Sequence, residues 1–113
     1  MRYTRMCAVG MALAFASTAT AQDRSANAAR QGAFWFKMCS APSMAASCAS
    51  YVMGLHDFHD LVGAQHWCLP PGVTASQLGS VFTKRLKDHP EELHKDAAWI
   101  ALQAFKKAFP CKQ

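Results

Sequence analysis

The sequence predicts an all-α fold, a small four-helix bundle-like domain with two disulfides that follows a cleaved signal peptide. Apolar residues recur with helical periodicity from residue 28 onward, and no segment shows the sustained alternation typical of a strand. Prolines mark short breaks between the periodic segments. An even number of cysteines follows the signal, which in a short exported chain is typical of a disulfide framework: Cys39, Cys48, Cys68 and Cys111.

The N-terminal residues have the three parts of an export signal. Arg2 and Arg5 give the chain a positive start. Residues 6–15 form a run of ten apolar residues, which is too short to span a bilayer. Ala-Thr-Ala at 19–21 supplies the small residues that precede a cleavage site, so we expect cleavage before Gln22.

The expected mature chain is one helical domain over residues 22–113, after a signal peptide over residues 1–21. Removing 21 of the 113 residues leaves 92, enough for a single domain. We expect this domain in the periplasm, where disulfides persist, and no later segment is long and apolar enough to suggest a membrane span. The formal charge of +5 falls to about +3 without the two arginines of the signal, and no basic block is present. Nucleic acid is therefore not an expected partner.

The first two helices are expected over residues 28–40 and 43–64. Pro42 separates them, because its ring disfavours helical geometry in the preceding residue. One side of the first helix carries Phe34, Trp35, Met38 and Cys39. The second helix is expected to present one mostly apolar face, made of Cys48, Tyr51, Val52, Leu55, Phe58, His59 and Val62. Asp57 and Asp60 lie away from the centre of that face.

The third and fourth helices are expected on either side of Pro90. Thr74 is the expected N-cap of the third helix, with Gln77 completing a capping box, and this helix ends near His89. Pro90 then occupies the first turn of the fourth helix, where a missing N–H is tolerated, and Pro110 ends it. The third helix has core spacing at Leu78, Val81, Phe82 and Leu86. The fourth carries an alanine stripe that allows close helix approach: Ala97, Ala101, Ala104 and Ala108.

Four cysteines allow three pairings, and the expected helix positions favour one of them. Cys39 ends the first helix and Cys48 begins the second, so a bridge between them joins a helical hairpin. Cys68 lies in a rigid loop and Cys111 follows the last helix, so the second bridge ties the C-terminus to the middle of the chain. A zinc site is not expected, because the spacings lack close cysteine pairs, and no Cys-x-x-Cys redox motif occurs.

Candidate catalytic and metal-binding residues are few. His56, His59 and Asp60 share a helix, but we do not expect them to converge, and a partly buried histidine with a hydrogen-bond partner is expected instead. No serine lies in a Gly-x-Ser-x-Gly motif, and no glycine-rich phosphate loop is present. We therefore expect no enzymatic activity, cofactor or metal, and the weaker alternative is an enzyme that uses His59 and Asp57.

An ordered set of residues covers nearly the whole mature chain. It consists of Cys39, Cys48, Ser50 to Gly54, Asp57, Cys68 to Thr74, Gln77, Leu78, Leu86, His89 to Glu91, Leu93, His94, Ala97, Ala98, Ala104, Phe105 and Phe109 to Cys111. In this set the chain resembles the Rap/Tai family of periplasmic immunity proteins linked to type VI secretion. The resemblance implies a small helical protein, often a homodimer, that binds a peptidoglycan amidase effector and blocks it sterically.

The family motif mostly marks scaffold residues, so exposure is our guide to the binding site. We expect the partner to contact the turn before the last helix, the rigid loop and one tryptophan, that is His66, Trp67, Asp88, His89, Pro90, Glu91, Glu92 and Trp99. Trp99 is either an interface anchor or a ring lying over lysine stems. The alternative function is a small disulfide-bonded periplasmic chaperone of the acid-stress type, because unperturbed histidines gain charge below about pH 6.5.

Overall fold

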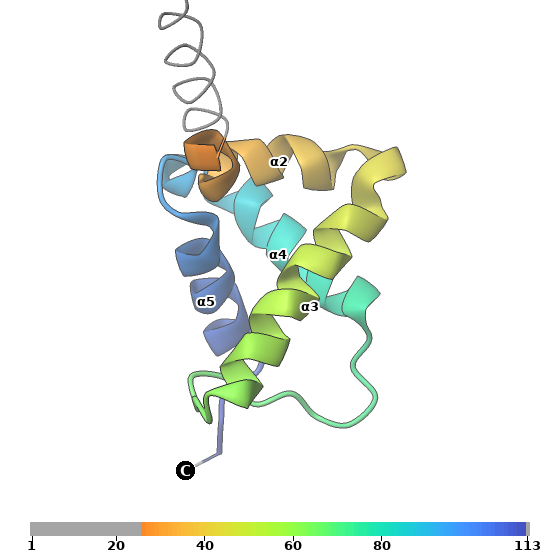
Figure 1. The fold of residues 1–113 in the computed structure, drawn as a ribbon, viewed down its shortest axis with the longest axis vertical. Helices are drawn as coiled ribbons and strands as arrows, with labels where there is room; N and C mark the ends of the chain where they lie inside the picture. Colours follow the sequence, from red (N-terminus) through yellow and green to blue (C-terminus); the bar gives the residue numbers. More distant parts are fainter. Residues whose placement is uncertain (1–25, 113) are drawn as a thin grey trace, which may run out of the picture.

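A computed structural model describes residues 26–112, and the fold is built from helices (Figure 1). After a helical turn at residues 26–30, the elements are α2 (Gly32–Ser40), the 3-10 helix η1 (Pro42–Met44), α3 (Ala45–Leu61), α4 (Ala75–Asp88), the 3-10 helix η2 (Pro90–Glu92) and α5 (Ala97–Ala108). In the described part, strand-like pairing is limited to an isolated bridge between Gln31 and Asp96. None of the described helices combines the length and apolar character that a membrane crossing requires. The predicted all-α class is confirmed, and the predicted signal peptide lies outside the described residues.

The core lies where α3, α4 and α5 pack together, and α2 closes one end of this arrangement (Figure 1). Its largest fully buried side chains are Phe82, Phe105, Leu78, Leu86, Ile100, Val52 and Cys48. Trp35 of α2 stacks on Tyr51 of α3, with ring centroids 4.0 Å apart. A Cβ on Gly79 would lie 3.3 Å from Cα of Ala49, so α3 and α4 cross closely at this glycine. The core positions predicted for the third helix are thus confirmed, except that Val81 is half-buried.

The cap of α4 and the two disulfides agree with prediction. The hydroxyl of Thr74 accepts a hydrogen bond from the backbone N–H of Gln77 at 3.2 Å, and the Gln77 side chain accepts one from the Thr74 N–H at 2.7 Å. This reciprocal pair satisfies two N–H groups that the first turn of a helix otherwise leaves unpaired. The disulfides are Cys39–Cys48 and Cys68–Cys111, with Cα–Cα distances of 5.3 and 4.9 Å.

The prediction that Pro90 opens the last helix is wrong. Residues 90–92 form the separate element η2, and α5 begins at Ala97. The carbonyls of Leu93 and Lys95 accept hydrogen bonds from the first two N–H groups of α2, at 2.8 and 2.9 Å. In a continuous helix these carbonyls would accept from N–H groups of their own helix. Pairing with the start of α2 therefore interrupts the helix and delays α5.

The C-terminal part of α3 also differs from prediction. The helix ends at Leu61, before Gly63, whose φ of 67° is outside the helical range. The prediction that Phe58 and Val62 belong to a buried apolar face is wrong, because they expose 63% and 58% of their surface. The ring of Trp67, from the following loop, covers a different side of these turns. The α3 residues that the fold does bury are Cys48, Val52 and His59.

Candidate functional site

The residues expected to contact a partner lie at two ends of the molecule. α4 runs from the loop of residues 62–74 to the end covered by α2, where it ends at Asp88 and residues 89–92 follow (Figure 1). Trp99 lies in the first turn of α5, which begins at this same end. His66 and Trp67 lie in the loop at the opposite end. The structure thus separates the expected site into a turn end, with residues 88–92 and Trp99, and a loop end, with His66 and Trp67.

Glu92 holds the turn end against α4 through a largely buried ion pair. Its carboxylate accepts two hydrogen bonds from Arg85 of α4, at 2.6 Å from Nη2 and 2.9 Å from Nε. Only 17% of the Arg85 side chain and 12% of the Glu92 side chain are exposed. The expectation that Glu92 is exposed is therefore wrong, because the ion pair holds η2 against α4. Arg85 could not be predicted as the partner of Glu92 from helical spacing, because α4 ends between these two residues.

The exposed side of the turn end carries charges that are already paired. Nζ of Lys84 donates a hydrogen bond to Asp88 at 2.6 Å, and Nδ1 of His89 lies 2.8 Å from Oε1 of Glu91. The hydrogen bond from Lys84 lowers the pKa of Asp88, and the hydrogen bond with His89 lowers the pKa of Glu91. Both carboxylates are therefore ionised at neutral pH, and the turn presents charges of both signs.

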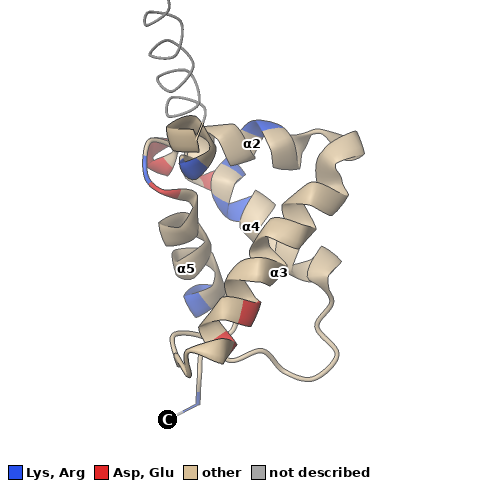
Figure 2. Cartoon of the chain, viewed as in Figure 1, with Lys and Arg blue, Asp and Glu red and all other residues tan. Residues whose placement is uncertain are grey.

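A groove of about 300 Å³ lies beside this turn, between α4 and α5. Apolar side chains from both helices line it, namely Val81, Ala104 and Ala108. Its charged lining consists of Lys84, Arg85, Asp88 and Lys107. Lys84 and Arg85 are already paired with Asp88 and Glu92, so Lys107 is the cation of this lining that has no ion pair among the described residues, and the groove is suited to an apolar or acidic side chain of another molecule. Figure 2 shows Lys and Arg residues along α4 and near the end of α5.

Trp99 is covered in part by its own chain. Nζ of Lys95 lies 3.9 Å from the centroid of the indole ring, and 37% of Trp99 is exposed. A lysine over an aromatic face is a cation–π contact, worth about 0.5–1 kcal/mol at an exposed site. Of the two alternatives that the sequence left open, the structure shows the ring packed against a lysine, and part of the ring stays accessible.

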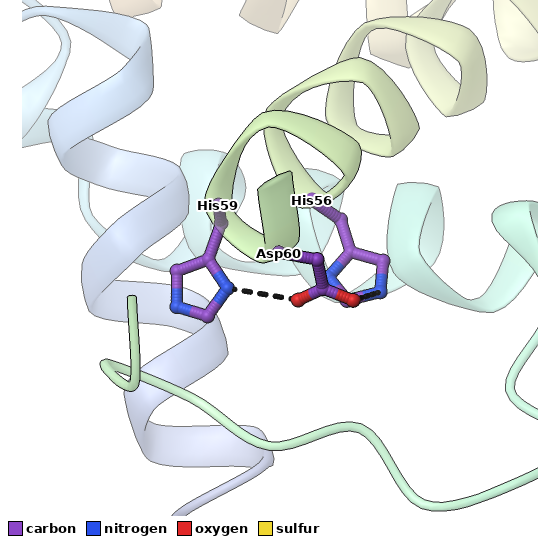
Figure 3. A group of neighbouring side chains, drawn as sticks. All are labelled: His56, His59 and Asp60. Atoms are coloured by element: carbon purple, nitrogen blue, oxygen red, sulfur yellow. Dashed lines mark hydrogen bonds and ion pairs between the residues drawn. The ribbon is translucent and has the colours of Figure 1, made fainter. Parts of the chain in front are cut away.

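Three polar side chains of α3 meet at the loop end (Figure 3). Nδ1 of His59 lies 3.1 Å from one carboxylate oxygen of Asp60, and Nε2 of His56 lies 3.4 Å from the other. The expectation that these residues do not converge is wrong, because the Asp60 carboxylate lies between the two rings. The prediction of a partly buried histidine with a hydrogen-bond partner is confirmed for His59, which at 6% exposure is more deeply buried than expected.

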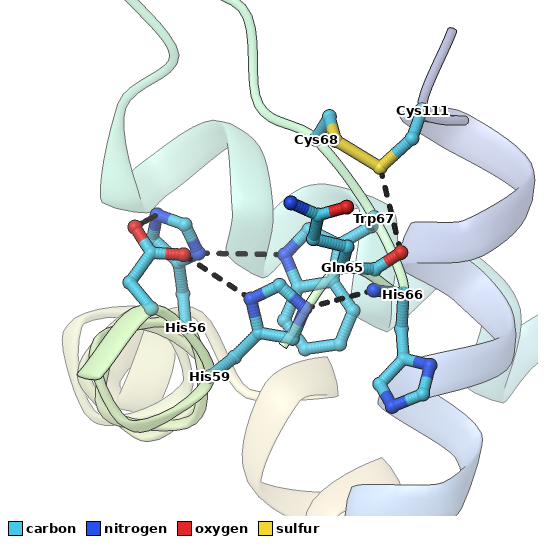
Figure 4. The surroundings of a disulfide bond; sticks show 8 residues. His56, His59, Gln65, His66, Trp67, Cys68 and Cys111 are labelled. Carbon is cyan, nitrogen blue, oxygen red and sulfur yellow. Dashed lines mark hydrogen bonds and ion pairs between the residues drawn. A yellow bond between two sulfur atoms is a disulfide. The ribbon is translucent and has the colours of Figure 1, made fainter. Parts of the chain in front are cut away.

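The loop reaches these histidines from the other side (Figure 4). The backbone N–H of His66 donates to Nε2 of His59 at 3.1 Å, and the indole N–H of Trp67 donates to Nδ1 of His56 at 3.4 Å. The Trp67 ring stacks on His59 with centroids 3.7 Å apart and also contacts Phe105 of α5. The expectation that Trp67 is exposed is therefore wrong, because its ring fills the space between α3 and α5 and only 7% is exposed. His66 is exposed, as expected.

These contacts, which we term the histidine network, define where the ring protons lie. An indole N–H and a backbone N–H can only donate, so Nδ1 of His56 and Nε2 of His59 are acceptors and carry no hydrogen. The protons then lie on the nitrogens that face Asp60. A metal bound between the three side chains would need those nitrogens unprotonated and hydrogens on the far ones, where a bound histidine normally donates to an acceptor. The surrounding donors therefore oppose a metal and favour a neutral hydrogen-bonded cluster.

The Cys68–Cys111 disulfide holds the loop beside this network (Figure 4). The N–H of Cys68 donates to the carbonyl of Phe109 at 2.9 Å, so a backbone hydrogen bond accompanies the covalent link. Sγ of Cys111 lies 3.6 Å from the carbonyl oxygen of Gln65. The loop end is consequently tied both to α3, through the histidines, and to the segment that follows α5.

Comparison with protein families shows which family the folded part of the chain matches. The family model described as Rap1a immunity proteins matches residues 31–111. The matched segment begins one residue before α2 and ends at Cys111, so it includes both disulfides, the Arg85–Glu92 pair and the histidine network. Neither the curated proteins nor the solved structures include a match to the chain.

Proposed function

This chain belongs to the family of Rap1a immunity proteins, and from that premise we propose that it binds and sterically inhibits a peptidoglycan amidase delivered by type VI secretion. The observation that carries the proposal is the family match over residues 31–111, which spans every helix from α2 to α5. Members of an immunity family act by binding an effector protein. The partner is therefore a protein, and the amidase activity of that partner is the part of the proposal that needs a test.

The proposed location is the periplasm. Residues 1–21 read as an export signal, and two disulfides persist only where the surroundings are oxidising. Peptidoglycan, the substrate of an amidase, lies in that same compartment. An inhibitor kept there meets the effector before the cell wall is cut.

We propose that inhibition involves no chemistry by this chain. The four cysteines of the described part are bonded to one another, so none of them offers a thiolate nucleophile. The far ring nitrogens of His56 and His59 accept hydrogen bonds from the loop. The proposed contact residues are the accessible members of the two ends, namely His66, Asp88, His89, Pro90, Glu91 and Trp99. Trp67 and Glu92 are proposed to support them from inside.

The turn end is the proposed obstructing element. The Arg85–Glu92 pair fixes it before any partner binds, so little conformational freedom is lost on binding. Its exposed residues carry both signs of charge, which favours a defined orientation in an enzyme groove. The resemblance to the Rap/Tai family also implies a homodimer, which sedimentation of the purified chain would test.

The test is binding to, and protection from, candidate amidases. Exported amidases encoded beside this gene are purified and mixed with the mature chain, and complex formation and peptidoglycan cleavage are measured. We expect a stable complex, loss of cleavage, and protection from lysis when both proteins are directed to the periplasm. Undiminished cleavage by every candidate in the presence of excess chain would contradict the proposal.

A second candidate is a chaperone of the acid-stress type, and the histidine network is the observation that favours it. Protonated histidine has a hydrogen on both ring nitrogens, so it cannot accept the bonds from His66 and Trp67. Loss of these bonds in acid would loosen the loop and uncover the Trp67 ring. Suppression of aggregation of a denatured client only in acid would support this function, whereas equal activity at pH 5 and pH 7.5 would exclude it.

A further inference from the structure

An apolar patch occupies the last turn of α3 and its C-cap. Phe58, Leu61 and Val62 expose 63%, 82% and 58% of their surface. They are spaced three and four residues apart, so they lie on one side of the helix. Trp99 is the one other large hydrophobic side chain found exposed in the described part of the chain, at 37%. Isolated exposed apolar residues are ordinary, whereas a contiguous group marks an interaction site. We term these three residues the α3 patch.

The α3 patch stands on a rigid support. A neighbouring side of the same turns holds His59, which is buried, stacked on Trp67 and hydrogen-bonded to the loop. Cys48 fixes the start of the helix through its disulfide to α2. The turns that carry the patch are therefore held in place through His59 and through the start of the helix. A surface that is fixed before binding loses little entropy when a partner docks.

Acidic side chains border the α3 patch. Asp57 and Asp60 are both exposed, and α3 contains no lysine or arginine. Figure 2 shows both acidic residues of this helix near its C-terminal end, away from the blue segments of α2 and α4, whereas the blue segment near the end of α5 is drawn closer to them. The Asp60 carboxylate lies between the rings of His56 and His59, and within the described residues Asp57 has no ion pair. The patch is thus locally negative on a chain whose formal net charge is +5.

The acidic border selects among possible occupants. In an antiparallel two-fold pairing of α3 patches, the carboxylates of one copy would face those of the other, and like charges across an interface oppose association. Bilayer surfaces and nucleic acids present phosphates, which the same carboxylates repel. A different protein with an apolar contact and a lysine or arginine border fits both features.

We propose that the α3 patch is a docking surface for a second protein whose apolar contact is bordered by basic residues. The inference rests on the proposed function, in which that protein is the effector. The charges of the turn end are already paired within the chain, so that end contributes obstruction more than affinity. A few desolvated side chains supply most of the binding energy at an interface, and the α3 patch offers an exposed aromatic ring, Phe58, flanked by two aliphatic side chains.

The first experiment tests the chemistry of the patch without an effector. The probe is a synthetic amphipathic peptide of leucine and lysine, titrated into the 15N-labelled mature chain. We expect amide shifts concentrated in residues 57–62, affinity that falls with salt, and about tenfold weaker binding by Leu61→Asp. The control Ser50→Asp adds the same charge to an exposed position earlier on α3 and should bind normally. Shift changes elsewhere, or equal binding of a leucine–glutamate peptide, would overturn the proposal.

The second experiment separates this inference from the proposed function. Leu61→Asp, Phe58→Ser and Ser50→Asp are compared in binding to an amidase that the wild-type chain inhibits. We expect the two patch variants to lose at least tenfold in affinity while circular dichroism stays unchanged, because both residues are exposed. Unchanged inhibition by both variants would contradict the proposal that the α3 patch is a docking surface, and it would not affect the proposed immunity function. Binding of the peptide probe without inhibition of any amidase would support the α3 patch as a docking surface and contradict the proposed immunity function.

Discussion

The turn end and the loop end are fixed by polar contacts of opposite kinds. At the turn end the Arg85–Glu92 pair works only while the carboxylate is ionised. At the loop end His56 and His59 hold the loop as neutral rings, and they stop accepting hydrogen bonds once both ring nitrogens are protonated. The loop end also has a disulfide beside it, whereas the turn end depends on noncovalent contacts. The same task, fixing a loop against a helix, is thus achieved with different sensitivity to acid and to reductant.

Removing the Cys68–Cys111 disulfide should affect the loop end most strongly. This bond links residues 43 positions apart, and Cys39–Cys48 links residues 9 apart. Because loop closure restrains the unfolded chain more for longer loops, the double serine variants should lose about 4 and about 2.7 kcal/mol of unfolding free energy. Urea unfolding followed by circular dichroism measures both losses, and equal losses would contradict loop closure as the cause.

Glu92→Gln should break the turn end. The change leaves the largely buried Arg85 guanidinium without its carboxylate, and we expect a loss of about 2 kcal/mol in unfolding free energy. Glu91→Gln is the matched control, because the neighbouring carboxylate is on the surface. Denaturant unfolding at pH 7 compares them. Similar stability of the two variants would show that the buried pair has no special role.

His59→Phe should weaken the loop end by a smaller amount. Phenylalanine keeps a ring that can stack on Trp67 but cannot accept the hydrogen bond from the His66 N–H. A buried donor left without a partner costs about 1–2 kcal/mol. Hydrogen exchange of the His66 amide should become faster, with His66→Ala as the control for its exposed ring. An unchanged unfolding free energy in His59→Phe would show that the histidine network does not stabilise the fold.

Acid should reveal the smallest effect, at the surface of the turn end. The folded chain holds the pKa of Asp88 and Glu91 below their ordinary values of 3.8 and 4.5. A lowered folded-state pKa stabilises the fold above the ordinary value, and this contribution disappears as the pH falls through the folded value. The stability difference between wild type and Asp88→Asn/Glu91→Gln should therefore be slight at pH 7 and absent near pH 2. If the stability difference grew as the pH fell, the folded chain could not be holding these two pKa values below their ordinary values.

Local sequence signals predicted the parts of the fold that depend on neighbouring residues. Thr74 and Gln77 are three positions apart and cap α4 without help from other elements. Leu78, Phe82 and Leu86 follow the helical period and fill the core. The cysteine pairing also followed from where helices begin and end. The cap and the Cys39–Cys48 bond lie within one element or between consecutive ones, whereas the Cys68–Cys111 bond joins residues 43 positions apart.

The features that sequence reasoning missed depend on contacts between distant segments. Leu93 and Lys95 interrupt the last helix because α2, some sixty residues earlier in the chain, needs their carbonyls. Trp67 is buried because α5 offers Phe105 as a neighbour, and its position decides which side of α3 is covered. The exposure of Phe58 follows from the same packing. Periodicity finds an apolar side chain but not the element, if any, that covers it.

The two disulfides join cysteines that follow one another along the chain, first Cys39 with Cys48 and then Cys68 with Cys111. A polypeptide that enters an oxidising compartment from its N-terminus meets each correct partner as the next thiol to arrive. An oxidase that links thiols in order of appearance would therefore produce the native bonds directly. Maturation should proceed at a normal yield in cells that lack a disulfide isomerase, because no wrong bond has to be undone.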